Sequence, residues 1–227
     1  MWSWSLEVSG IRADWYASAF GASMLSSIEV TVEATIATLV VSVLAGYAFA
    51  RLQFRASKAV LWLVLATLVL PLFTLVVALF KLMVQIHLIN TQLGLDLVYL
   101  STQAPLAIWL FHNYCRDLPL EPEEAALIDG CTHWQAFRKV VLPQMRSGIA
   151  ATTAIIVLLV YGQFLIPLLL ASSASTTPVT VLITNFVGKY STDYPLVAAG
   201  GVMALIPPAI VALALNRHIR GMLSGST

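Results

Sequence analysis

Histidine and cysteine are the side chains best suited to metal binding and nucleophilic catalysis, but their spacing in this sequence forms no recognisable site. The histidines are His87, His112, His133 and His218. Cys131 lies near His133, but two residues do not make a zinc site, and Cys115 and Cys131 do not make a disulfide framework. The Gly-x-x-x-x-Gly-Lys-Ser/Thr loop that cradles nucleotide phosphates is absent from the sequence. We expect no catalytic residues, no metal and no cofactor in this chain.

Residues 115–148 combine acidic, basic and apolar side chains in a pattern that favours binding of a partner. Glu121, Glu123 and Glu124 fall at the start of a predicted short helix, where the positive end of the helix dipole favours acidic side chains. The helix is predicted to end at Asp129-Gly130, because glycine permits a backbone turn that other residues resist.

A second short helix is predicted directly after this turn. Thr132 and Gln135 fit a capping box, Trp134 and Phe137 share one face, and Pro143 is predicted to stop the helix. Two interpretations remain open: the helix pair lies on lipid headgroups, or it is a docking site for a soluble partner. The mixed charge favours docking, because a helix that lies on lipid is usually basic on its polar face.

The composition places this helix pair in an integral membrane protein. Of 227 residues, 59% are hydrophobic and only 10% are charged. The mean hydropathy is +0.87. Soluble domains carry about 25% charged residues, so a water-soluble globular domain is excluded. Twelve basic residues against 11 acidic ones leave a net charge of +1, which is too balanced for a nucleic-acid-binding protein.

Five apolar stretches are long enough to cross a bilayer as helices. They are residues 26–50, 59–80, 97–114, 149–171 and 196–216. Nine of the 12 basic residues fall after the first, third and fifth stretches, so the positive-inside rule places 115–148 and the C-terminal tail 217–227 in the cytoplasm. The polar N-terminal tail 1–25 is then outside. Either this tail is translocated unaided or an upstream span is absent from this chain, and we favour the second. Tyr47, near a span end, suits an interfacial aromatic belt, although packing explains such aromatics about as often.

Polar residues inside the spans can either pack against another helix or face a polar cavity or a partner. Thr31, Thr35, Thr38 and Ser42 form a single stripe along the first span, and we expect this stripe to pack against another helix. Glu33 differs, because an ionisable group inside a span is costly unless it faces a polar cavity or a partner.

The cytoplasmic loop resembles a known signature. Glu124-Ala125-Ala126, three residues, Gly130, nine residues, Val140, one residue and Leu142-Pro143 resemble the EAA signature of ABC-importer permeases. That signature ends in Ile-x-Leu-Pro, so Val140 is a conservative departure. Residues 45–51, 97–100, 105–110 and 177–179 resemble the carbohydrate branch of the family, the maltose-system type, and the resemblance covers about residues 26–225.

This resemblance implies an all-α membrane protein with the type I ABC-importer permease fold, in which 26–216 form the transmembrane domain. Members usually have six spans, so this chain supplies the last five. The loop acts in the family as a coupling helix that inserts into a separate ATP-binding subunit. The residues that the resemblance assigns to coupling are Glu123, Glu124, Ala125, Ala126, Asp129, Gly130, Trp134, Phe137, Leu142 and Pro143. Glu124 would supply polar contact, Gly130 the turn, and Trp134 with Phe137 the apolar anchors.

The resemblance also implies partners and a substrate class. The partners are a dimer of ATP-binding subunits, a second permease, an extracytoplasmic solute-binding protein and membrane lipid. The solute is a sugar or a sugar derivative, and its path would involve Glu33, Tyr161, Gln163 and Asn185. Relatives often have Trp-Asn where this chain has Tyr161-Gly162-Gln163-Phe164, which leaves the individual solute open.

Two other functions are compatible with a multi-span chain. An ion-driven secondary transporter typically has internal repeats and paired intramembrane charges, whereas Glu33 is the one candidate charge here. A noncatalytic scaffold would use the loop only to recruit a partner. Uptake measured with an inactive ATPase separates these classes.

Overall fold

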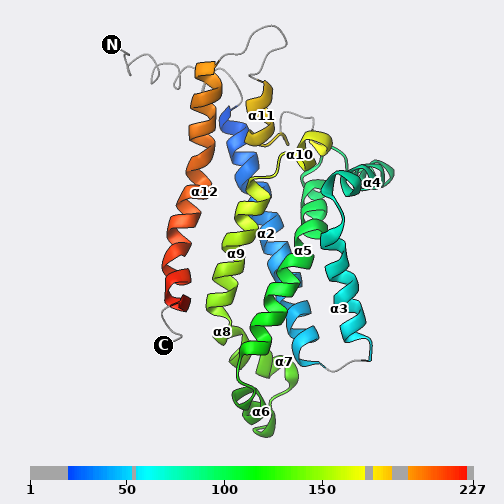
Figure 1. Ribbon diagram of the computed structural model, residues 1–227, viewed down its shortest axis with the longest axis vertical. Helices are drawn as coiled ribbons and strands as arrows, with labels where there is room; N and C mark the ends of the chain where they lie inside the picture. Colours follow the sequence, from blue (N-terminus) through cyan, green and yellow to red (C-terminus); the bar gives the residue numbers. More distant parts are fainter. Residues whose placement is uncertain (1–19, 53–54, 172–175, 186–193, 224–227) are drawn as a thin grey trace.

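The regular structure in the computed structural model is helical throughout the residues that it describes, which are 20–52, 55–171, 176–185 and 194–223 (Figure 1). The long and medium helices are α2 (Phe20–Arg51), α3 (Ser57–Ala66), α4 (Leu72–Gln85), α5 (Gln92–Asp117), α9 (Arg146–Tyr161) and α12 (Tyr194–Leu223). The short ones are η1 (Thr67–Val69), α6 (Glu121–Ile128), α7 (His133–Ala136), η2 (Phe137–Val141), α8 (Leu142–Gln144), α10 (Leu165–Leu170) and α11 (Val179–Asn185). Most of the predicted N-terminal tail lies outside the described residues.

Three helices of the described chain are each long and apolar enough to cross a membrane unbroken. They are α2, α5 and residues 197–214 within α12. They correspond to the first, third and fifth predicted spans, and α5 is longer than the predicted 97–114 at both ends. The described chain is therefore the expected all-α membrane bundle.

The second and fourth predicted spans are not single helices. The predicted span 59–80 breaks at Leu70-Pro71, and α4 continues at 104° to the helix formed by α3 and η1. Proline has no amide hydrogen to donate and disfavours a helical conformation in the residue before it, so the chain turns here. The predicted span 149–171 ends at Tyr161, and α10 is a separate short helix after Gly162-Gln163.

Helices α2 and α5 lie side by side along the middle of the bundle, with α9 against both (Figure 1). The predicted polar stripe of α2 is buried at all four positions, and Ser42 Oγ donates a hydrogen bond to the Ala104 carbonyl at 3.4 Å. A Cβ added to Gly46 would lie 2.6 Å from Phe111 Cβ, so only glycine permits this approach. The interpretation of the stripe as a packing surface is confirmed.

Candidate functional site

The predicted cytoplasmic loop forms the tip of the molecule at one end of the bundle, beneath α2, α5 and α9 (Figure 1). Helix α6 ends in a hydrogen-bonded turn at Gly130, whose φ of +86° is a left-handed conformation. The amide of Gly130 donates to Leu127 O at 3.1 Å, and that of Cys131 donates to Ala126 O at 3.0 Å. This pair of bonds is a Schellman cap, which favours glycine at the left-handed position. The predicted role of Gly130 in the turn is confirmed.

The second helix of the loop begins where the sequence predicts but continues past its predicted end. Thr132 Oγ1 accepts from the Gln135 amide at 3.3 Å, and the Thr132 amide donates to Gln135 Oε1 at 2.9 Å, which completes the capping box. The prediction that Pro143 stops the helix is wrong. The helical run continues to Gln144 and then turns by 72° into α9. The wider π-helical turn η2 directly precedes α8, in which Pro143 occupies the first turn, where proline is tolerated.

The outer surface of the tip carries exposed apolar side chains between charged ones. Ile128 is 86% exposed and Trp134 is 59% exposed, and they lie on opposite sides of the Gly130 turn. Besides Trp134, the predicted coupling residues that are exposed are Glu124, Ala125, Asp129, Gly130 and Pro143. Sequence reasoning missed Ile128 as a contact candidate, although a large apolar residue directly before Asp-Gly at a helix end was a usable signal.

The inner surface of the loop packs against the bundle. Phe137 is buried, as are Val141 and Met145, and these three join a cluster with Tyr47 and Phe111 of the long helices. Ala126 and Leu142 are half-buried. Phe137 therefore faces this chain's own interior in the structure, and Trp134 stacks on it with ring centroids 5.4 Å apart. It positions Trp134 instead of presenting a surface of its own.

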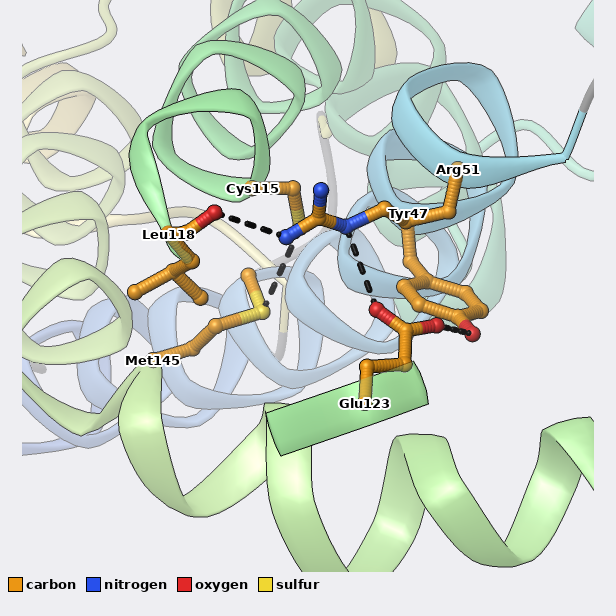
Figure 2. A network of polar contacts seen from close by, with 6 residues as sticks. All are labelled: Tyr47, Arg51, Cys115, Leu118, Glu123 and Met145. Carbon is orange, nitrogen blue, oxygen red and sulfur yellow. Dashed lines mark hydrogen bonds and ion pairs between the residues drawn. The ribbon is translucent and has the colours of Figure 1, made fainter. Parts of the chain in front are cut away.

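Glu123 also points inward, into a polar network shown in Figure 2. Tyr47 Oη donates to Glu123 Oε1 at 2.6 Å, and Arg51 Nε lies 3.2 Å from Glu123 Oε2. Neither Arg51 Nε nor Glu123 Oε2 makes a hydrogen bond. The contact between these two atoms is therefore an ion pair without the alignment of a hydrogen bond. Arg51 Nη2 donates to the Leu118 carbonyl at 2.9 Å, at the end of α5. The network thus joins α2, α5 and α6.

Sequence reasoning did not place Tyr47 and Arg51 in this site. Tyr47 is 7% exposed and bonded to Glu123, so of its two interpretations the structure supports packing and not the interfacial belt. Their spacing of four residues does put both on one face of the end of α2, but only the folded chain brings Glu123 to that face.

The chain matches a known protein family over most of its length. Residues 38–222 match the family model of the binding-protein-dependent transport system inner membrane component. The chain belongs to this family. The match runs from the middle of α2 to α12 and includes the whole of the loop, so the loop is part of the family domain.

Characterised relatives of the permease are transport proteins. The osmoprotective compounds uptake permease protein GgtD of Synechocystis is 34% identical over 92% of this chain and 71% of its own length. The lactose transport system permease protein LacG of Rhizobium radiobacter is 32% identical over 87% of this chain and 72% of its own. The trehalose transport system permease protein SugB of Mycobacterium tuberculosis is 31% identical over 91% and 77%.

Solved structures share the fold of the permease. A chain of a bacterial ABC transporter that imports the acidic polysaccharide alginate superposes with a TM-score of 0.77, at 19% identity, over 91% of this chain and 78% of that one. The methionine transporter MetNI in an inward-facing form gives 0.68 at 16% identity, over 88% and 94%. The family match and the relatives identify the chain as a multi-pass permease component of an ABC importer, and the solved structures show that it has the fold of such permeases.

The predicted solute-path residues do not form one group. Tyr161 and Gln163 line the same small cavity, together with Ser27, Thr31 and Tyr99. Glu33 is exposed on α2 and is not among the lining residues. The side chain of Asn185 lies outside the described residues.

Glu33, one of two acidic residues in the first predicted span, has a neighbour that the sequence did not indicate. The carboxyl group of Glu33 lies close to that of Asp96, from α5. Because α5 begins at Gln92 and not at 97, Asp96 lies within the helix instead of before it. Glu33 is therefore not the lone acidic side chain of this part of the bundle. Within the described residues, no three His, Cys, Asp or Glu side chains are placed to hold a metal ion.

Proposed function

We propose that the permease carries a sugar or sugar derivative across the cytoplasmic membrane, driven by a dimer of ATP-binding subunits that docks on the loop 115–148. A second permease and an extracytoplasmic solute-binding protein complete the assembly. The observation that carries the proposal is the exposed tip, where Ile128 and Trp134 flank the left-handed Gly130 turn beneath a bundle with an ABC-importer fold.

The outward side chains are the ones that would touch the ATP-binding subunit. Large exposed apolar residues between charged neighbours are typical of an interface that is completed by another protein. We assign this contact to Glu124, Ala125, Ile128, Asp129 and Trp134, because all five are exposed. Glu123 and Phe137, which the resemblance also assigns to coupling, are buried behind this surface and are not among its contacts.

The carbohydrate assignment is supported by the names of relatives. LacG and SugB are named for lactose and trehalose transport, and each covers most of this chain. We assign Tyr161, Gln163 and Asn185 to the solute path, and Glu33 either to that path or to a contact with the second permease. The orientation follows the basic residues: the loop and the C-terminal tail are in the cytoplasm and the N-terminal tail is outside.

Photocrosslinking tests the docking. Ile128→Cys in a Cys131→Ser background, labelled with a benzophenone maleimide, should crosslink to the ATP-binding subunit in a nucleotide-dependent way, since Cys115 is buried and stays unlabelled. Lys58→Cys, exposed on the predicted cytoplasmic side but outside the loop, is the matched control and should not crosslink. Absence of a crosslink at position 128 in every nucleotide state would contradict the proposal.

Uptake separates the three classes of function. Radiolabelled lactose and trehalose are offered to cells that express the complete system, with the ATPase either intact or inactivated. An ATP-driven importer loses uptake with the inactive ATPase and keeps it after the ion gradient is collapsed with ATP maintained. A secondary transporter gives the opposite result, and a scaffold gives no uptake in either case.

A further inference from the structure

We propose that Tyr47, Arg51 and Glu123 form a joint that transmits movement of the docked loop to α2. This inference rests on the proposed docking role of α6. The three residues are referred to below as the α2–α6 joint, and Tyr47 is its central member.

Helix α6 is otherwise held loosely. Among its eight residues, all of them described, Glu123 is the only buried one. Its packing neighbours are α7 and η2, which belong to the same loop. A force applied to α6 by a partner would reach the transmembrane helices poorly without a specific link, because the exposed side chains of α6 touch little of the bundle.

The polar contacts of the joint supply that link. The Arg51 and Glu123 side chains are 9% and 8% exposed. The carboxylate is held at both oxygens, by Tyr47 Oη and by Arg51 Nε, while Arg51 also reaches the Leu118 carbonyl (Figure 2). A buried charge that loses its partner is strongly disfavoured, so α6 cannot leave α2 without a large penalty.

An aromatic chain makes a second connection to the same residue. Trp134, at the exposed tip, stacks on Phe137, and the Phe137 ring lies 4.7 Å from the Tyr47 ring, centroid to centroid. Tyr47 is therefore linked to both parts of the docking surface. Its hydroxyl contacts Glu123 of α6, and its ring contacts Phe137 of η2, on which Trp134 of α7 stacks. These are independent contacts, one polar and one apolar, that converge on one position of α2.

From Tyr47, the movement passes into the core of the bundle. The adjacent Gly46 lies against Phe111 so closely that a Cβ would come within 2.6 Å of Phe111 Cβ. Closely packed helices do not slide past one another continuously, so displacement of the end of α2 also moves α5. The joint thus connects the docking surface to the α2–α5 pair.

The test measures uptake and ATP hydrolysis together in the complete transporter reconstituted in proteoliposomes. Glu123→Gln keeps the shape of the side chain but removes the charge, and Tyr47→Phe keeps the ring contact but removes the hydroxyl. Both should leave assembly with the ATP-binding subunits and ATP hydrolysis intact, while solute moved per ATP hydrolysed falls by about 2- to 30-fold. Glu121→Gln removes an exposed charge from the same helix and is the control, with an unchanged ratio.

A charge exchange distinguishes transmission from simple stability. Arg51→Glu alone should lower the ratio further than Glu123→Gln, because two carboxylates then face each other, and adding Glu123→Arg should recover part of it. If Glu123→Gln and Tyr47→Phe retain the normal ratio, the joint is refuted while docking stands. If either variant loses binding of the ATP-binding subunit, the residue acts in docking and the joint is also refuted. If Ile128→Cys does not crosslink to the ATP-binding subunit in a protein whose joint is unaltered, the proposed function itself is refuted.

Discussion

Gly130 offers the sharpest test of the loop, because its substitution acts through the backbone alone. Its φ is +86°, and a Cβ built at this position meets no atom within 4 Å. A larger side chain therefore has room within this chain, so the strain that it causes here comes from the left-handed conformation. Gly130→Val should impair transport severely, Gly130→Ala less, and Gly130→Asn least, since asparagine tolerates this conformation better than other residues with a Cβ.

The magnitude follows from the conformational cost. A non-glycine residue held in this region costs about 1–3 kcal/mol, with β-branched valine at the upper end. If the partner recognises only the Schellman-capped form of the turn, the substitution lowers the population of that form, and the apparent affinity falls by the same factor. A cost of this size corresponds to about 5- to 150-fold in affinity.

Binding and uptake are measured in parallel for the four proteins. The permease in nanodiscs is titrated with the ATP-binding subunit in the presence of a nonhydrolysable nucleotide, and uptake is measured in cells with permease abundance in the membrane as the control. Equal affinities for Val, Asn and Gly at position 130 would refute the conformational argument. If all three substitutions lower the affinity equally, the cause is a direct contact between the ATP-binding subunit and the glycine, and not the left-handed φ.

Three further outcomes are expected. Gly46→Val should lower the thermal stability of the purified permease strongly, whereas Gly201→Ala, where an added Cβ meets no atom within 4 Å, should not; equal melting temperatures would contradict the close α2–α5 contact. Ile128→Asp should weaken binding of the ATP-binding subunit by at least about tenfold, as expected for an apolar hot spot, without loss of folding because the side chain is exposed; unchanged binding would remove Ile128 from the interface. Glu33→Gln should change the affinity or rate of uptake if Glu33 lines the solute path, and unchanged kinetics would leave only the contact with the second permease.

The local features of the loop could be predicted from residue types alone. The capping box of Thr132 and Gln135 involves residues three positions apart, and the turn at Gly130 depends on the conformational freedom of one residue. Both are short-range effects, so no knowledge of the rest of the fold was needed. The buried stripe of α2 was predictable for a related reason, because helical periodicity alone places its members on one face.

The breaks in the helices were only partly predictable. Pro71 interrupts a continuous apolar stretch, yet Pro105 lies inside α5, which remains a single helix of 26 residues. A proline in a membrane helix is tolerated when neighbouring groups satisfy the backbone that it frees, and this depends on packing. The 104° turn before α4 is thus a property of the folded bundle, and hydropathy over 59–80 could not reveal it.

What the sequence by itself determined is the class of protein: its low charge and its apolar stretches require membrane helices, and its basic residues predict which loops face the cytoplasm. What only the tertiary structure decided is which charged and aromatic side chains act together. Glu123 lies 72 positions from Arg51 and next to Glu124 in the sequence, yet Glu123 is buried against Arg51 while Glu124 faces outward. Adjacent residues on a helix point about 100° apart, and which of them meets the bundle is set by how the loop folds back against α2 and α5.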